Sequence, residues 1–299
     1  MFTYNSLNGD VELLELNEEF NEQLVEDIHK KVIRGAHWFR EAQLWIRITS
    51  AYNNPLNYGC VHSELSLIRQ IENELAEFIG NKELIILGVG VGDTESSIVD
   101  IQLRRNNFSS IVGIDINTEF LNLFENSLKI RQCETPELKI EYQKIQGYFE
   151  DLSVSHPFID DNQHIPTLIC MLGSTIGNYN DTGEILELLQ EISKKGDLIL
   201  LGYQLSYNID SIYLKYKNNA MFKDLIGNYL TLRERKRIRW CMNRNNSSIE
   251  AWLNDIQVFR SRKFEKNQLK EMTQQYKLNS VKEWVDRYNN ICIHLFERI

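Results

Sequence analysis

A short apolar strand that runs into a glycine-rich turn is the feature that most constrains the fold of this chain. Residues 84–87 read Leu-Ile-Ile-Leu, Gly88, Gly90 and Gly92 come next at alternate positions, and a helical pattern extends to residue 103. Glycine lets the backbone approach a nucleotide closely and take a positive φ, both of which a side chain opposes. Alone, the same turn also fits close packing between a strand and a helix, so its interpretation depends on the end of the next strand.

The next predicted strand, residues 111–114, ends in an acidic residue. Asp115 lies roughly twenty residues after the glycine turn, where a carboxylate can accept hydrogen bonds from both hydroxyls of a ribose. The same side chain suits the N-cap of a helix that begins at Thr118, and the two roles are compatible. The turn and Asp115 together indicate a nucleotide-cofactor site.

Strands and helices alternate along most of the chain, which predicts an α/β fold with a Rossmann-like, mostly parallel sheet covered on both faces. Asp181 and Glu184 predict a capping box at the start of one helix, and Gly196 predicts its end. Regularity is lost between residues 206 and 264, which look like an insertion. The predicted strands are 84–87, 111–114, 138–145, 167–172, 198–202, 249–258 and, as a late antiparallel strand, 290–296; the predicted helices are 64–79, 93–103, 118–128, 182–195 and 209–232.

Composition and charge argue against several classes of protein. With 42 acidic and 33 basic residues, the chain lacks the basic surface of a nucleic-acid-binding protein, and we expect the basic stretch at 233–239 to be a solvated face. The five cysteines include no CxxC pair and fit free thiols in a reducing cytosol, and the six histidines form no metal-spaced cluster. No apolar stretch is long enough to cross a bilayer. The sequence therefore predicts a cytoplasmic protein without metal, nucleic-acid or membrane partners, and it leaves the oligomeric state open.

The glycine turn and Asp115 also permit a nicotinamide cofactor, and two observations argue against one. The glycines are spaced GxGxG and not GxGxxG. The second observation is the sequence after the strand at 167–172, which points to a different cofactor.

Residues 171–179 read Met-Leu-Gly-Ser-Thr-Ile-Gly-Asn-Tyr. They resemble the LGSTIGN signature of the histidine-specific methyltransferase family, whose members trimethylate the α-amine of histidine or methylate the amine of a prenylated tryptophan. The resemblance extends, more thinly, from about Leu44 to the C-terminus. It implies a class I methyltransferase fold, S-adenosylmethionine as cofactor with S-adenosylhomocysteine as product, and a small-molecule amine as substrate.

The resemblance also assigns roles to individual residues. Asn178 and Tyr216 match catalytic positions that orient the acceptor, and Gly147-Tyr148-Phe149 matches the GDF of the adenine pocket. The implied substrate residues are Gly173, Asn178, Tyr58, Tyr216, Ala251, Phe259 and Ser261; the implied cofactor residues are Gly88, Gly90, Gly92, Asp115, Tyr148 and Phe149. We expect residues 60–205 and 265–299 to form the cofactor-binding core, and residues 1–59 and 206–264 to form a substrate-binding elaboration.

Three departures from the family pattern bear on the substrate. Phe259 stands where family members carry a glutamate that reads the imidazole, Ala251 replaces a methionine, and Tyr148 replaces the acidic residue of GDF. Loss of the carboxylate leaves an imidazole without its partner, which costs about 1–3 kcal/mol. The sequence thus predicts N-methylation of an amino-acid-like amine other than histidine.

Three alternatives remain open at this point. The protein could methylate histidine itself, act on a carrier-bound or peptidic amine, or be a non-catalytic subunit that binds S-adenosylmethionine. Turnover with a defined amine separates the last of these from the others.

Overall fold

The computed structural model describes residues 18–31, 35–50, 60–80, 82–105, 108–149, 152 and 166–299. The chain forms two compact units. The first unit comprises Met1–Tyr58, Asn178–Asn180 and Asn208–Lys263, and the second comprises Gly59–Gly177, Asp181–Tyr207 and Phe264–Ile299.

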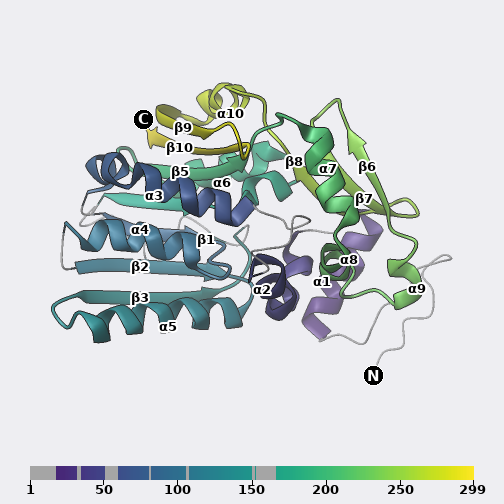
Figure 1. Ribbon diagram of the computed structural model, residues 1–299, viewed down its shortest axis with the longest axis horizontal. Coiled ribbons are helices and arrows are strands. Elements are labelled where there is room, and N and C mark those ends of the chain that lie inside the picture. The colour runs from purple at the N-terminus through teal and green to yellow at the C-terminus, as the bar shows by residue number, and fades with distance from the viewer. Residues whose placement is uncertain are drawn as a thin grey trace. The chain divides into compact units, whose positions relative to one another are not determined.

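The second unit is built on a seven-stranded sheet with the order β3-β2-β1-β4-β5-β10-β9 (Figure 1). Strands β1 to β5 pair in parallel, whereas β10 is antiparallel to both β5 and β9. The predicted α/β fold with a mostly parallel sheet and a late antiparallel strand is confirmed. The strands are β1 (Glu83–Leu87), β2 (Phe108–Asp115), β3 (Lys139–Gln146), β4 (Thr167–Met171), β5 (Leu198–Gln204), β9 (Leu278–Asp286) and β10 (Ile291–Arg298).

Helices α3, α4, α5 and α6 of the second unit match predicted helices, with changes at their ends, whereas α10 was not predicted. Helix α3 packs against α4, and α4 packs against α5. Among the residues that the structure describes, no helix combines the length and apolar character needed to cross a membrane. The helices are α3 (Cys60–Ile79), α4 (Asp93–Leu103), α5 (Thr118–Glu134), α6 (Thr182–Ile192) and α10 (Gln268–Thr273), with short 3-10 turns η4 (Thr175–Asn178) and η5 (Gln274–Tyr276).

Helix α6 shows how local capping departs from the prediction. Asp181 is the N-cap, but its side chain accepts from the backbone N–H of Gly183, and the expected capping box with Glu184 does not form. The helix ends at Ile192, before Gly196. Ser193 comes directly after it, and its hydroxyl donates to the carbonyl of Leu189. A serine bond to the preceding turn thus replaces the expected glycine stop.

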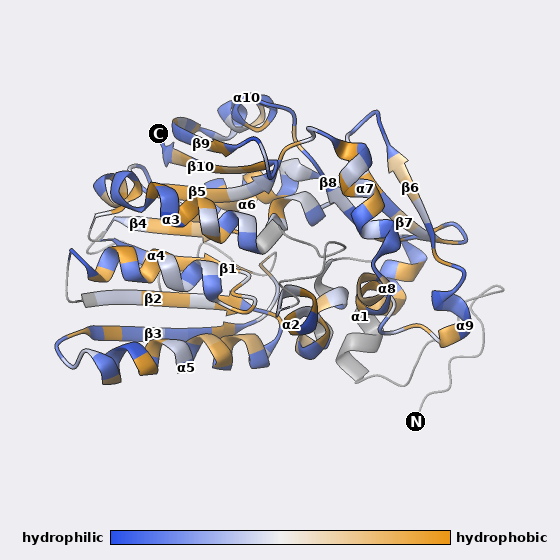
Figure 2. Cartoon of the chain, viewed as in Figure 1, coloured by the Kyte–Doolittle hydropathy of each residue, from blue (hydrophilic) through white to orange (hydrophobic). Residues whose placement is uncertain are grey.

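The core lies along the central strands, as expected for strands buried on both faces of an α/β sheet. All residues of β4 and β5 are buried, and β4 and β10 are coloured as hydrophobic in Figure 2. Strand β3, at one edge, is mostly exposed and hydrophilic. The strand order reverses between β1 and β4, because the chain continues from β1 towards β3 and later from β4 towards β5. The carboxyl ends of strands at such a switch point are where α/β proteins bind ligands.

The first unit combines short helices with a three-stranded antiparallel sheet in the order β6-β7-β8. Its elements are α1 (Glu18–His29), η1 (Gly35–Arg40), α2 (Ala42–Ser50), α7 (Ile209–Asn218), α8 (Ala220–Ile226), α9 (Leu232–Arg235), β6 (Arg239–Asn243), β7 (Ser248–Leu253) and β8 (Ile256–Arg262).

Two predicted elements of this unit are wrong in extent. The helix expected over 209–232 is divided, because Asn219 caps the start of α8 and Thr231 forms a capping box with Glu234 at the start of α9. The strand expected over 249–258 is a hairpin. Its turn contains Asn254 with a φ of 55°, a conformation that asparagine tolerates.

Candidate functional site

The glycine turn comes directly after β1, at the switch point of the sheet. Gly88, Gly90 and Gly92 have φ values of 79°, 54° and 79°, the left-handed region that favours glycine. A Cβ atom on Gly88 would lie 3.2 Å from the ring of Phe149 and 3.8 Å from the hydroxyl of Thr175. The turn therefore depends on glycine for its conformation, and at Gly88 it lies close to two other loops of this edge.

Gly92 has a packing role that sequence reasoning did not reveal. A Cβ atom there would lie 2.7 Å from the ring of Phe124, a residue of α5. Gly92 is also the N-cap residue of α4, without a side-chain cap. The third glycine thus allows the start of α4 to approach α5 closely.

Asp115, the last residue of β2, links the glycine turn to the segment after its own strand. One carboxylate oxygen accepts from the N–H of Gly90 at 3.0 Å, and the other accepts from the N–H of Asn117 at 2.9 Å. The N-cap of α5 is Asn117 and not Asp115, so the alternative role considered for Asp115 is wrong. Burial raises the pKa of Asp115 to about 6, although its hydrogen bonds to backbone N–H groups act in the opposite direction.

The segment after β4 holds unusual backbone conformations. Gly173 has a φ of 69°, and Ser174, which is buried, has a φ of 61°. A non-glycine residue in this region is strained, and such strain tends to occur at functional sites. The hydroxyl of Thr175 donates to the carbonyl of Leu172 at 2.7 Å, which closes the turn.

Glu64, on α3, is a residue of this site that sequence reasoning missed. It is fully buried, and one of its carboxylate oxygens accepts from the N–H of Gly173 at 2.7 Å. Burial raises the pKa of Glu64 to about 8, and the hydrogen bond from Gly173 only partly offsets this effect. The two residues are 109 positions apart, so no local pattern could connect them.

The raised pKa of Glu64 makes a prediction about stability. A carboxyl group whose pKa is higher in the folded state contributes stability that is present below the unfolded value, 4.5, and lost as the pH rises through the folded value, about 8. Glu64→Gln has no such loss. Its free energy of unfolding, measured by denaturant titration relative to the wild type, should therefore rise by at least about 1.4 kcal/mol between about pH 5 and pH 8.5.

Glu95, in the first turn of α4, interacts electrostatically with Glu64. Its pKa is itself raised, first by burial and then by the charges of Glu64 and other acids, so both groups act in the same direction. A difference between the variant and the wild type that stays constant with pH would contradict the prediction.

The first unit brings together Tyr216 of α7 and Ser261 of β8, two of the predicted substrate residues. Lys263, which was not predicted, is fully buried between them. Its ammonium donates to the Ser261 hydroxyl at 2.8 Å and to the Tyr216 hydroxyl at 3.1 Å, and the Tyr216 hydroxyl donates to Ser261 at 3.3 Å. The ammonium also lies 5.0 Å from the centre of the Tyr216 ring, within the range of a cation–π interaction.

Phe259 is the centre of an aromatic cluster, defined here as Trp38, Tyr216, Phe222, Trp240 and Phe259. The ring of Phe259 lies 4.6 Å from Trp38, 5.2 Å from Phe222 and 5.4 Å from both Tyr216 and Trp240, measured between ring centres. Only 1% of the Phe259 surface is exposed. The position where the family pattern has a carboxylate is therefore enclosed by aromatic rings.

Ala251 of β7 is fully buried and pairs with Phe259 on β8 and with Trp240 on β6. Asn178 belongs to the first unit, where its Cβ atom lies 3.5 Å from the position that a Cβ of Gly35 would take. Gly173 belongs to the second unit. Tyr58 lies outside the described residues. Tyr148 is partly buried next to Phe149 in the segment after β3.

Residues 40–236 match the family described as histidine-specific methyltransferase, SAM-dependent. The chain belongs to this family. The match includes the glycine turn, Asp115 and the segment after β4, so the resemblance drawn from residues 171–179 is confirmed, and S-adenosylmethionine is the cofactor of the family. Comparison with curated proteins finds no match.

Solved structures with partly similar folds include two methyltransferases and a further protein. An S-adenosylmethionine-dependent methyltransferase from Clostridium acetobutylicum is 9% identical, with 86% of this chain and 96% of that chain covered and a TM-score of 0.48. A protein from Pyrococcus horikoshii is 13% identical, with coverages of 85% and 98% and a TM-score of 0.49. Magnesium protoporphyrin IX methyltransferase from Synechocystis, with bound SAH, is 10% identical, with coverages of 88% and 98% and a TM-score of 0.49. The assignment of this chain rests on the family match and on its own strand order.

The carboxyl edge of the sheet fits the cofactor of the histidine-specific methyltransferase family. Gly88 and Gly90 leave backbone open to a close approach, and Asp115 offers its carboxylate at the end of β2. Glu64, Glu95 and Asp115 are buried at this edge, burial raises the pKa of each, and a bound cation would favour their charged forms. Gly88, Gly90, Asp115 and Phe149 are the residues that would hold S-adenosylmethionine.

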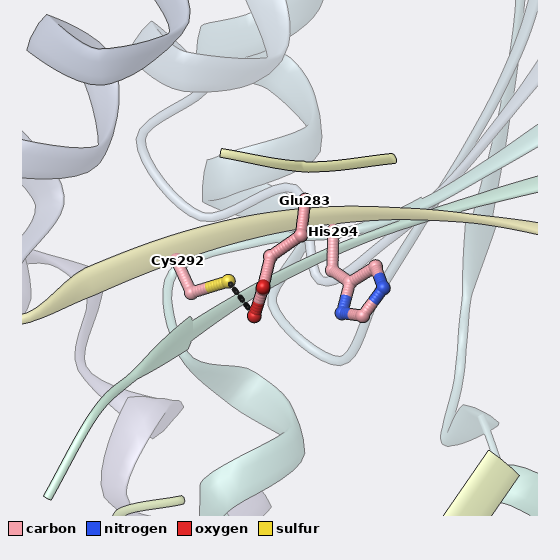
Figure 3. A group of neighbouring side chains, drawn as sticks. All are labelled: Glu283, Cys292 and His294. Carbon is pink, nitrogen blue, oxygen red and sulfur yellow. Dashed lines mark hydrogen bonds between the residues drawn. The ribbon is translucent and has the colours of Figure 1, made fainter. Parts of the chain in front are cut away.

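A separate polar cluster lies on the last two strands of this family member. Glu283, Cys292 and His294 come together there, within 4.8 Å of one another (Figure 3). The thiol donates to Glu283 at 3.5 Å, and the two nitrogens of His294 bond Tyr203 and Ser280. Burial raises the pKa of Cys292 and lowers that of His294 to about 3. Sequence reasoning could not find this group, because its members lie on two strands without a ligand-like spacing.

Proposed function

We propose that this methyltransferase transfers a methyl group to the amine of a small amino-acid-like substrate other than histidine. We assign cofactor binding to the second unit, and recognition of the acceptor to Gly173 and to residues of the first unit. The observation that carries the proposal is the enclosure of Phe259 by the aromatic cluster, in place of a carboxylate. An imidazole N–H that loses such a partner on binding would be left unsatisfied, which disfavours histidine.

The hydrogen bonds around Ser261 support an amino-acid-like substrate. A serine hydroxyl has one proton to donate and two lone pairs that accept. The oxygen of Ser261 already accepts from Lys263 and from Tyr216, so its own proton remains for a further bond. Ser261 is therefore suited to an acceptor group on the substrate, such as a carboxylate or carbonyl oxygen.

Bound S-adenosylmethionine supplies an electrophilic methyl group on a sulfonium. The chain's own residues then have to hold a neutral amine in line and exclude water, since methyl transfer of this kind needs little acid–base chemistry. We assign the amino-acid head group to Gly173 and Asn178. Tyr216, with Tyr58, orients it, and the buried Lys263 fixes the positions of the Tyr216 and Ser261 hydroxyls.

Replacing Asn178 with alanine should separate substrate recognition from cofactor binding. With an amine that the wild type methylates, we expect kcat/KM to fall about tenfold or more, because one hydrogen bond to a charged group is lost. The affinity for S-adenosylhomocysteine, measured by isothermal titration calorimetry, should change less than about twofold, because the cofactor residues of the second unit are untouched.

Asn180→Ala is the matched control, because Asn180 is exposed and contributes its backbone carbonyl to Arg260. It should retain wild-type kinetics. Equal losses of turnover and cofactor affinity in Asn178→Ala, or no loss of either, would remove Asn178 from the substrate site.

A further inference from the structure

Glu64 has a feature that its bond to Gly173 does not explain. Its second carboxylate oxygen, Oε1, is buried and has no hydrogen-bond partner among the described residues. A buried polar atom without a partner costs free energy, and a carboxylate costs more than a neutral group. A bound ligand is one way in which such an atom obtains a partner.

The strand beneath Glu64 is built to make room for this oxygen. A Cβ atom on Gly202 would collide with Glu64 Oε1, at only 1.7 Å, and would lie 3.2 Å from the side chain of Leu172. Gly202 lies within β5, a fully buried strand, where glycine weakens the strand and marks a close approach of another group. The unpartnered oxygen therefore has a defined position, held by α3 on one side and by β5 on the other.

The surroundings of this oxygen favour a cation. Glu95, in the first turn of α4, is also buried, and burial and the charge of Glu64 raise its pKa, so a cation bound here would favour the charged form of both carboxyls. The other oxygen of Glu64 holds the N–H of Gly173, at the start of the family signature. A ligand donor at Oε1 would thus lie next to the segment that is expected to hold the substrate.

We propose that Glu64 Oε1 accepts a hydrogen bond from the amino group of a bound ligand. Two ligands of this enzyme have such a group: the methionine part of the cofactor, where it is an ammonium, and the acceptor amino acid, where the amine reacts in its neutral form. The second source rests on the proposed function, whereas the first requires only that the protein binds its cofactor. Glu64 is in either case a binding residue that acts as a hydrogen-bond acceptor, and a bound cation would favour its charged form.

The test compares two probes that differ in the ammonium group. S-adenosylhomocysteine carries an amino-acid part, and 5′-methylthioadenosine has the same nucleoside and thioether without it. Their affinities are measured by calorimetry for the wild type, for Glu64→Gln and for Glu72→Gln. Glutamine keeps an acceptor for Gly173 and removes the charge. Glu72, on the same helix, pairs with Arg104 at the surface and serves as the matched control.

If the amino group that bonds to Glu64 belongs to the cofactor, Glu64→Gln should bind S-adenosylhomocysteine about tenfold or more weakly. It should bind 5′-methylthioadenosine as tightly as the wild type does. If it belongs to the acceptor, both affinities stay unchanged and KM for the amine rises about tenfold or more. Glu72→Gln should match the wild type throughout. Wild-type affinities and a wild-type KM in Glu64→Gln, with a circular-dichroism spectrum that shows a folded protein, would overturn the inference. A wild type that binds both probes but methylates no amine would instead count against the proposed function, and it leaves the cofactor comparison valid.

Discussion

Replacing Phe259 with alanine should lower the free energy of unfolding by about 3–5 kcal/mol, the cost of removing a large aromatic side chain from a packed core. Phe259 is 1% exposed and contacts four other rings, so its removal leaves a cavity that these rings cannot easily fill. Denaturant unfolding monitored by tryptophan fluorescence measures the loss, because Trp38 and Trp240 belong to the same cluster.

Phe259→Leu is the control for this prediction. It keeps most of the buried volume and should cost clearly less than the alanine variant. If Phe259→Ala loses under about 1 kcal/mol, the ring does not belong to a packed core. Phe259 would then give no reason to exclude an imidazole from this position.

Replacing Asp115 with alanine should weaken the binding of S-adenosylhomocysteine about 100-fold or more. The expected hydrogen bonds from the two ribose hydroxyls to the Asp115 carboxylate are lost. The variant also removes the acceptor for the N–H groups of Gly90 and Asn117, which hold the glycine turn in place. Calorimetric titration at constant pH measures the change in affinity.

Asp197→Ala is a matched control, since Asp197 is a buried aspartate that accepts from the N–H groups of Thr167 and Lys194, before the amino end of β5. It should destabilise the fold to a similar degree and leave the affinity for S-adenosylhomocysteine unchanged. Equal losses of affinity in both variants would mean that Asp115 acts only through stability.

The central sheet was predictable because its strands are short apolar runs. Strands β1, β2, β4 and β5 carry that pattern, and the alternation at 290–296 indicated β10. Strand β9 was not predicted, since only Leu278 and Trp284 are buried among its nine residues. Its pairing with β10 is a tertiary property that local sequence does not encode.

The insertion was harder to predict because its breaks depend on single capping residues. Asn219 and Thr231 each accept a hydrogen bond that begins a new helix inside an otherwise continuous helical pattern. The hairpin turn at Asn254 likewise lies inside a pattern that looks like one strand.

The proposed cofactor residues can be predicted from the sequence more directly than Glu64 and Lys263. The glycine turn and Asp115 lie at strand ends, where the fold brings them to one edge of the sheet. Glu64 and Lys263 could not be found in this way. Glu64 lies 109 positions from Gly173, and Lys263 lies 47 positions from Tyr216, so only the folded chain reveals these contacts.

The most direct test of the proposed activity is a single incubation of the protein with S-adenosylmethionine labelled in its methyl group and an equimolar mixture of free amino acids and related amines, including histidine. Mass spectrometry then identifies which compounds carry the label. We predict label on an amine other than histidine. Label on histidine alone would contradict the interpretation of Phe259, and no label on any amine, with the cofactor bound, would contradict the assignment of N-methyltransferase activity.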